Sequence, residues 1–172
     1  MSLIVEDGTG LANAESLCSV ADADTIHAAR GNTAWAVFTT PQKEQRLRKG
    51  TEYMTGRYSL LWAGYRKTAT QALDFPRECV PIVGLRFIQY YDNGTVPNEV
   101  KQACALLALR ADEDVDLMAD EKRKVISETV EGAVSVTYSE FSSVQVRYTE
   151  IDAMLSRFLT NGSGRTAQMV RV

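Results

Sequence analysis

Residues that bind metals or form disulfides are scarce in this chain. Its 172 residues include three cysteines, Cys18, Cys79 and Cys104, and a single histidine, His27. No two cysteines have the C-x-x-C spacing, and a zinc site needs about four cysteine or histidine ligands at set spacings. The sequence therefore argues against a metal site and a disulfide framework. We expect three buried free thiols, which behave as small hydrophobic side chains.

The chain also lacks an excess of basic residues and any long apolar run. Its net charge of −3 argues against a dedicated nucleic-acid-binding domain, because such domains are usually strongly basic. No apolar run approaches the roughly 20 residues that span a bilayer. Glu6 and Asp7 stand where a secretory signal would carry basic residues. The composition, 45% hydrophobic and 24% charged, predicts one globular domain made in the cytoplasm, without membrane contact.

Catalytic and nucleotide-binding motifs are missing as well. Phosphate-binding loops require G-x-x-x-x-G-K-[ST] or G-x-G-x-x-G before a helix, and the glycines at 8–10 continue into neither pattern. The nucleophile motif G-x-S-x-G is absent, and the Gly-Ser-Gly run at 162–164 has only His27 in the chain as a base. We therefore expect no enzyme activity and no cofactor.

What the sequence does contain is an aromatic stretch near its middle. Trp62, Tyr65 and Phe75 can each bury a large apolar area. Arg66 and Arg77 are the strong hydrogen-bond donors nearby, and they suit carboxylates or backbone carbonyls. We expect these five residues to form either the structural plug of a small domain or part of a subunit interface.

Four helices are predicted from periodic apolar residues and capping signals. They span residues 20–30, 41–58, 97–112 and 148–159. Ser19 and Thr40 are suited to cap the first two, and Pro41 suits a first helical position. The helix at 97–112 is apolar nearly all round. It is therefore either the central core helix or a helix shared between the core and a subunit contact.

Three polar features are expected to be exposed to solvent. His27 lies at a helix edge with no partner visible in the sequence, so we expect a surface or half-buried residue, not a titrating switch. The mixed-charge face of the 41–58 helix is expected to be solvated, with phosphate contact as the alternative. Residues 112–121 hold six acids and no base but lack the glycine of a calcium loop. This predicts a solvated connector, with repulsion of DNA or contact with a basic partner as alternatives.

A β-hairpin is predicted at about 124–138. Val134, Val136 and Tyr138 alternate with small polar residues, and Gly132 allows a tight turn. An isolated hairpin is marginal in water, so it must pack on the helices or pair with a neighbouring chain. Residues 79–91 alternate poorly, which leaves a strand and a loop insertion both open.

Apolar segments stand at both ends of the chain. Residues 1–14 form a predicted extended arm that must lean on its own domain or on a neighbouring subunit. Residues 161–172 begin as a flexible link and continue as a predicted docking arm, which adds as a strand to a partner's sheet edge. The residues expected to dock are Arg165, Met169, Val170, Arg171 and Val172. Between the arms, residues 15–160 form the predicted domain. The fold class is mainly α with a small β part: a bundle of about four helices plus a β-hairpin and extended terminal arms.

Several motifs, in the same order, resemble a family encoded near the portal and capsid genes of tailed bacteriophages and prophages. The matching stretches are 5–10, 19–24 leading to 28–31, Trp62-x-Gly-x-Arg66, 71–77, and Val96-Pro97 with Val100-Lys101 before an Ala/Leu-rich helix. The resemblance covers roughly residues 3–160. Proteins of this family are often labelled DnaT-like single-stranded DNA-binding proteins.

The resemblance implies a head–tail connector, or adaptor, located at the head–tail interface of the virion. Such adaptors form a ring of about twelve copies under the portal protein. The ring extends the channel for passing double-stranded DNA, without sequence specificity, and offers a platform to the next tail protein. In related adaptors a C-terminal arm docks on the portal, which falls on residues 165–172 here.

The alternative is a single-stranded DNA-binding module. It requires aromatic platforms in a basic groove, a role that Trp62, Tyr65 and Arg66 would fill. The net charge of −3 and the acidic run at 112–121 oppose this alternative.

Overall fold

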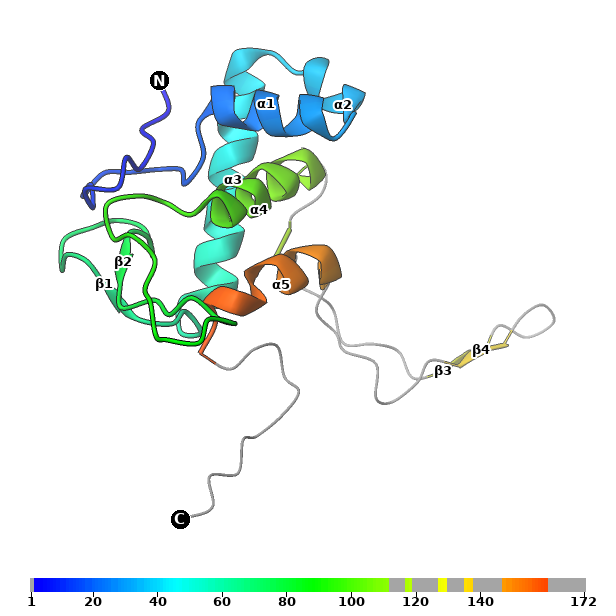
Figure 1. Cartoon of the computed structure of the whole chain (residues 1–172). Helices are drawn as coiled ribbons and strands as arrows, with labels where there is room; N and C mark the ends of the chain where they lie inside the picture. Colours follow the sequence, from blue (N-terminus) through cyan, green and yellow to red (C-terminus); the bar gives the residue numbers. More distant parts are fainter. Residues whose placement is uncertain (1, 112–116, 119–126, 130–134, 138–146, 161–172) are drawn as a thin grey trace.

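The computed structural model describes residues 2–111, 117–118, 127–129, 135–137 and 147–160. Its helices are α1 (Val20–Ala29), α2 (Thr33–Ala36), α3 (Thr40–Tyr58), α4 (Asn98–Arg110) and α5 (Thr149–Leu155), which continues into the 3-10 helix η1 (Ser156–Phe158). Two antiparallel strand pairs accompany them: β1 (Tyr65–Arg66) with β2 (Arg77–Glu78), and β3 (Ser127–Thr129) with β4 (Ser135–Thr137). The predicted mainly α fold with a small β part is confirmed (Figure 1).

The core forms where α4 crosses α3 (Figure 1). Gly50 of α3 permits the close approach, because a Cβ at this position would lie 2.9 Å from the carbonyl oxygen of Cys104 in α4. Cys104 is fully buried, as are Val100 and Leu107 on either side of it. The prediction of a core helix at 97–112 is therefore confirmed. The predicted buried stripe of α3 is confirmed as well: Leu47, Thr51, Met54 and Tyr58.

Local capping determines where α1 and α3 begin. Ser19 Oγ accepts a hydrogen bond from the backbone N–H of Asp22 at 3.0 Å, as its spacing predicts. The cap of α3 is Thr39 and not the predicted Thr40, because Thr39 N–H donates to the Gln42 side chain at 2.9 Å. Helix α3 therefore begins one residue earlier than predicted.

The short helix α2 was not predicted from the apolar run after α1. It carries Trp35, whose indole N–H donates to the carboxylate of Asp24 at 2.6 Å. Lys43 of α3 pairs with the same carboxylate at 2.8 Å. The Asp24 carboxylate thus ties α2 and α3 to α1, and the pKa of Asp24 is lowered by these two partners against the effect of burial.

His27 requires a correction, because it is buried and fully partnered. Its ring lies 4.6 Å from that of Trp35. Nδ1 faces the amide nitrogen of Asn32 at 3.1 Å, and Nε2 faces the carbonyl oxygen of Ala105 in α4 at 3.0 Å. An amide nitrogen can only donate and a carbonyl only accept, so His27 is neutral with its proton on Nε2. Burial lowers its pKa.

The N-terminal segment lies on its own domain. Val5 forms a bridge with Ser16, and the buried carboxylate of Glu6 accepts hydrogen bonds from the N–H groups of Gly8, Gly10 and Leu11 at 2.8–2.9 Å. Three charge-assisted bonds from one turn hold this segment in a single conformation. The Glu-x-Gly-x-Gly pattern at residues 6–10 therefore has a structural role.

The remaining predictions concern cysteines, connector and hairpin. Cys18 and Cys104 are buried free thiols, as predicted, but Cys79, whose φ is 56°, is exposed. Of the predicted acidic connector, only 117–118 are described. The hairpin strands are confirmed, with Ser127 opposite Thr137. No helix in the described part is long and apolar enough to cross a membrane.

Candidate functional site

The end of α3 carries an aromatic stack on which the loops of the domain are built. Trp62 follows α3 and packs edge-on against Phe75, with ring centroids 4.9 Å apart. Phe75 in turn contacts Phe158 of η1 at 6.3 Å, also edge-on. The indole N–H of Trp62 donates to the carboxylate of Asp74 at 3.1 Å, so the one polar atom of this buried ring is satisfied.

Arg77 holds the loops around this stack together. Its side chain is only 8% exposed. Nε donates to the carbonyl oxygen of Ala63 at 2.8 Å and Nη2 donates to that of Gly64 at 2.8 Å. Longer bonds reach the carbonyl oxygens of Asp74 and Trp62. The planar guanidinium thus binds four backbone carbonyls from two segments, whereas a lysine has only three donors, all on one nitrogen atom.

Arg66 has a similar role, while Tyr65 points into solvent. Arg66 Nη2 donates to the carbonyl oxygens of Gln71 and Leu73. Tyr65 pairs with Glu78 across the β1–β2 ribbon and is 74% exposed. Of the five residues predicted in this stretch, Trp62, Phe75 and Arg77 are therefore buried, whereas Tyr65 and Arg66 are exposed.

Residues 79–91, for which the sequence allows either a strand or a loop, form a loop next to the aromatic stack. Tyr91 N–H donates to the carbonyl oxygen of Val80 at 2.9 Å, and Ile82 N–H donates to that of Gln89 at 2.8 Å. Val80 is buried, and the Tyr91 ring lies 4.9 Å from that of Phe158. The base of the loop is therefore attached to the aromatic stack. We call residues 82–90 the apolar loop.

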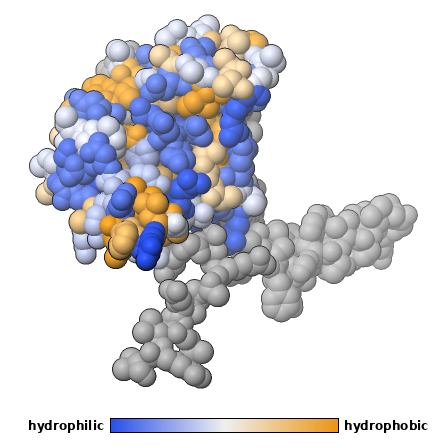
Figure 2. Space-filling view, viewed as in Figure 1, coloured by the Kyte–Doolittle hydropathy of each residue, from blue (hydrophilic) through white to orange (hydrophobic). Residues whose placement is uncertain are grey.

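The side chains of the apolar loop are directed outward. Phe87 is 73% exposed and Ile88 is 79% exposed. Three more large hydrophobic residues of the loop are exposed: Val83, Leu85 and Tyr90. Figure 2 shows hydrophobic surface at the lower end of the domain, where the chain that follows β2 lies in Figure 1. So many large apolar side chains in one exposed loop indicate a binding surface.

Charge is sparse on this surface. Arg86 is the only cation of the apolar loop, and its guanidinium lies 5.7 Å from the centre of the Phe87 ring. Glu78 and Asp92, both exposed, flank the loop. The surface is therefore apolar and aromatic at its centre, with one positive charge within it and two negative charges beside it.

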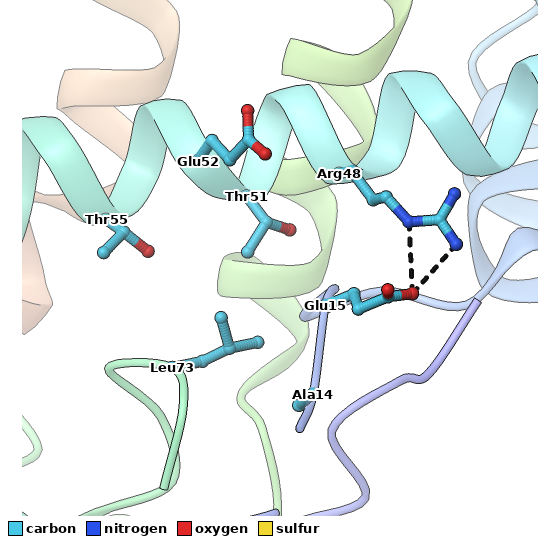
Figure 3. A pocket seen from close by; sticks show the side chains of 7 residues that line it. All are labelled: Ala14, Glu15, Arg48, Thr51, Glu52, Thr55 and Leu73. Carbon is cyan, nitrogen blue, oxygen red and sulfur yellow. Dashed lines mark hydrogen bonds and ion pairs between the residues drawn. The ribbon is translucent and has the colours of Figure 1, made fainter. Parts of the chain in front are cut away.

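A second feature is an open hollow of about 390 Å³ between α3 and the N-terminal segment (Figure 3). Arg48 of α3 pairs with Glu15 on its wall at 2.8 Å, and this contact lowers the pKa of the Glu15 carboxyl. Thr51 accepts a hydrogen bond from Leu17 N–H at 3.3 Å, so its hydroxyl supports the fold. The hollow thus lacks a nucleophile beside a base, and we assign it no chemistry.

Metal binding finds no support in the described residues, which contain no group of three or more His, Cys, Asp or Glu side chains that could hold an ion. The predicted docking residues Arg165, Met169, Val170, Arg171 and Val172 lie outside the described part, as do Val134 and Tyr138. Val136 lies in β4, opposite Glu128.

The apolar loop was missed as a site by reasoning from the sequence. The signal was present, because residues 79–91 carry a run of large apolar residues without the alternation of a half-buried strand. Such a run indicates either a buried strand or an exposed loop, and periodicity alone does not distinguish them.

Comparison with known proteins identifies a family to which the chain is similar. A sequence model of the family described as "Putative DnaT-like ssDNA binding protein" matches residues 1–172. That description names DNA binding and no catalysed reaction. No curated protein and no solved structure matches the chain. The resemblance to the DnaT-like family is thus confirmed, whereas nothing in the comparisons bears out a head–tail connector.

Proposed function

The chain belongs to the family described as "Putative DnaT-like ssDNA binding protein", and from this membership we propose that it binds single-stranded DNA through the apolar loop. The observation that carries the proposal is the exposure of three aromatic rings, Tyr65, Phe87 and Tyr90, at this end of the domain. Single-stranded DNA presents unpaired bases, and each base that stacks on an aromatic ring contributes about 1–3 kcal/mol.

Arg86 supports the same proposal. It is the cation of the loop and lies beside Phe87, where it can contact a phosphate while a base stacks on the ring. It is the only cation among residues 82–90, so we expect modest affinity with a shallow dependence on salt. One phosphate contact contributes a slope of about −0.7 for a single strand.

Fluorescence anisotropy with a labelled oligothymidylate tests this function. Phe87→Ala should weaken binding by roughly 5- to 150-fold, from the loss of one stacked base. Arg86→Ala should also reduce the salt slope. The matched control is Val37→Ala, which truncates an equally exposed apolar side chain beside α2 and should leave affinity unchanged. Equal affinities for the Phe87 and Val37 variants would contradict this proposal.

A second candidate function is suggested by the aliphatic residues of the same loop. Val83, Leu85 and Ile88 offer no ring for a base, and such side chains are characteristic of protein interfaces. Further, at least six cations of the described part are paired with carboxylates, which partly neutralise the charge they offer to a phosphate: Arg30, Lys43, Arg48, Lys101, Arg110 and Arg157.

In this second proposal the protein is the head–tail connector subunit of a tailed phage. The apolar loop contacts a neighbouring copy in the ring, and residues 165–172 dock on the portal. The next tail protein binds the ring. Portal rings offered as bait separate the two proposals. Deletion of 165–172 should spare folding and abolish portal binding. A protein that ignores the portal but binds the oligonucleotide supports the first function, and the opposite result supports the second.

A further inference from the structure

Neither proposed function says what covers the apolar loop in the free protein. Its large side chains, Phe87 among them, are exposed, and Figure 2 shows hydrophobic surface at this end of the domain. Exposed apolar surface of this kind promotes nonspecific association. A segment that covers the loop reversibly would keep the protein dispersed until a partner binds.

The described chain ends beside this loop. Thr160 N–H donates to the carbonyl oxygen of Leu61 at 2.8 Å, and Leu159 forms a bridge with Trp62. Phe158 contacts Tyr91 at the base of the loop. Residues 161–172 therefore start at the same end of the domain as the apolar loop, directly next to its base.

The length and composition of residues 161–172 suit a return onto the loop. Residues 161–164 are Asn-Gly-Ser-Gly, a composition typical of linkers, and twelve residues reach up to about 40 Å when extended. A segment tethered by so short a link has an effective concentration in the millimolar range at a nearby surface. Docking within one chain then needs only weak contacts.

The two partners are complementary in polarity and charge. Residues 165–172 are apolar at Met169, Val170 and Val172, and they contain two arginines and no acid. The apolar loop is flanked by the exposed carboxylates of Glu78 and Asp92. The loop also has a hairpin-like backbone, with Pro81 paired to Tyr90, and an extended segment can add to such a backbone as a further strand.

We propose that residues 165–172 dock on the apolar loop of their own chain in the free protein and are displaced when a binding partner takes the loop. The segment shields Phe87 and Ile88 from water, and its arginines face the two flanking carboxylates. The inference concerns the free protein, so it stands or falls independently of both proposed functions.

A spin label on Cys79 tests the proposal in the full-length protein. Cys79 is the exposed thiol, whereas Cys18 and Cys104 are buried, so the native protein takes the label at the base of the loop. We expect paramagnetic broadening of the backbone amide signals of residues 165–172. Phe87→Ser and Ile88→Ser change exposed side chains and should abolish this broadening. The control Val37→Ser should retain it.

Two results would overturn the proposal. The first is the absence of broadening at residues 165–172 in the monomer, or broadening that persists in the Phe87 and Ile88 variants. The second comes from a mixture of spin-labelled protein at natural isotope abundance with unlabelled ¹⁵N protein. Broadening in that mixture would mean that the segment docks on another copy, whereas docking within one chain leaves those signals sharp.

Discussion

Replacement of Arg77 by methionine tests whether the guanidinium stabilises the segments around the aromatic stack, to which the apolar loop is attached. Methionine keeps an apolar stem of similar length and removes all five donors. Two short hydrogen bonds are lost, to the carbonyl oxygens of Ala63 and Gly64 at 2.8 Å each. At the lower figure of about 1.5 kcal/mol for each hydrogen bond to a charged group, the loss of two should lower the free energy of unfolding by about 3 kcal/mol.

Urea unfolding followed by tryptophan fluorescence measures this loss, because Trp62 lies within the affected region. With an m value of about 2 kcal/mol/M, the midpoint should fall by about 1.5 M. The matched control is Arg86→Met, which makes the same change on the exposed loop and should stay within about 0.5 kcal/mol of the parent. Equal midpoints for the Arg77 and Arg86 variants would refute the reasoning.

Three further predictions concern His27, Gly50 and the cysteines. Burial lowers the pKa of His27 in the folded protein below its unfolded value of about 6.5. Its contribution to the free energy of unfolding should therefore be complete above about pH 6.5 and decline as the pH falls below that value. Urea unfolding between pH 5 and 7.5 should show a weaker dependence of stability on pH for His27→Gln than for the parent. Gly50→Ala should destabilise by about 1–3 kcal/mol although alanine favours helices, because its Cβ meets the backbone of α4; thermal melting measures this. Cys79 should react with a thiol reagent in the native protein, whereas Cys18 and Cys104, whose pKa values are raised by burial, should react only in denaturant.

The helices of the core could be predicted because their signals are local. The spacing of Leu47, Thr51, Met54 and Tyr58 indicates one buried face of α3 without knowledge of any partner. The cap at Ser19 depends on residues three positions apart. Such patterns involve only residues within one turn or one helix, so they can be recognised in the sequence without knowledge of the fold.

Features that depend on distant contacts could not be predicted. The burial of His27 depends on the carbonyl oxygen of Ala105, which is 78 positions away in the chain. The sequence indicates that Arg77 binds carbonyls or carboxylates. The identity of its partners depends on β2 lying beside residues 62–64, and the sequence does not show this. The apolar loop was undecided because its composition suits a buried strand equally well, and only the fold shows that no described element covers it.

The most direct test of the account is anisotropy of a labelled oligothymidylate with the parent protein and the Phe87→Ala and Val37→Ala variants, across a salt series. If the apolar loop binds single-stranded DNA, Phe87→Ala loses affinity, Val37→Ala does not, and affinity falls modestly with salt. No binding by the parent protein, or equal binding by all three, would contradict the central claim that the apolar loop is the DNA-binding surface.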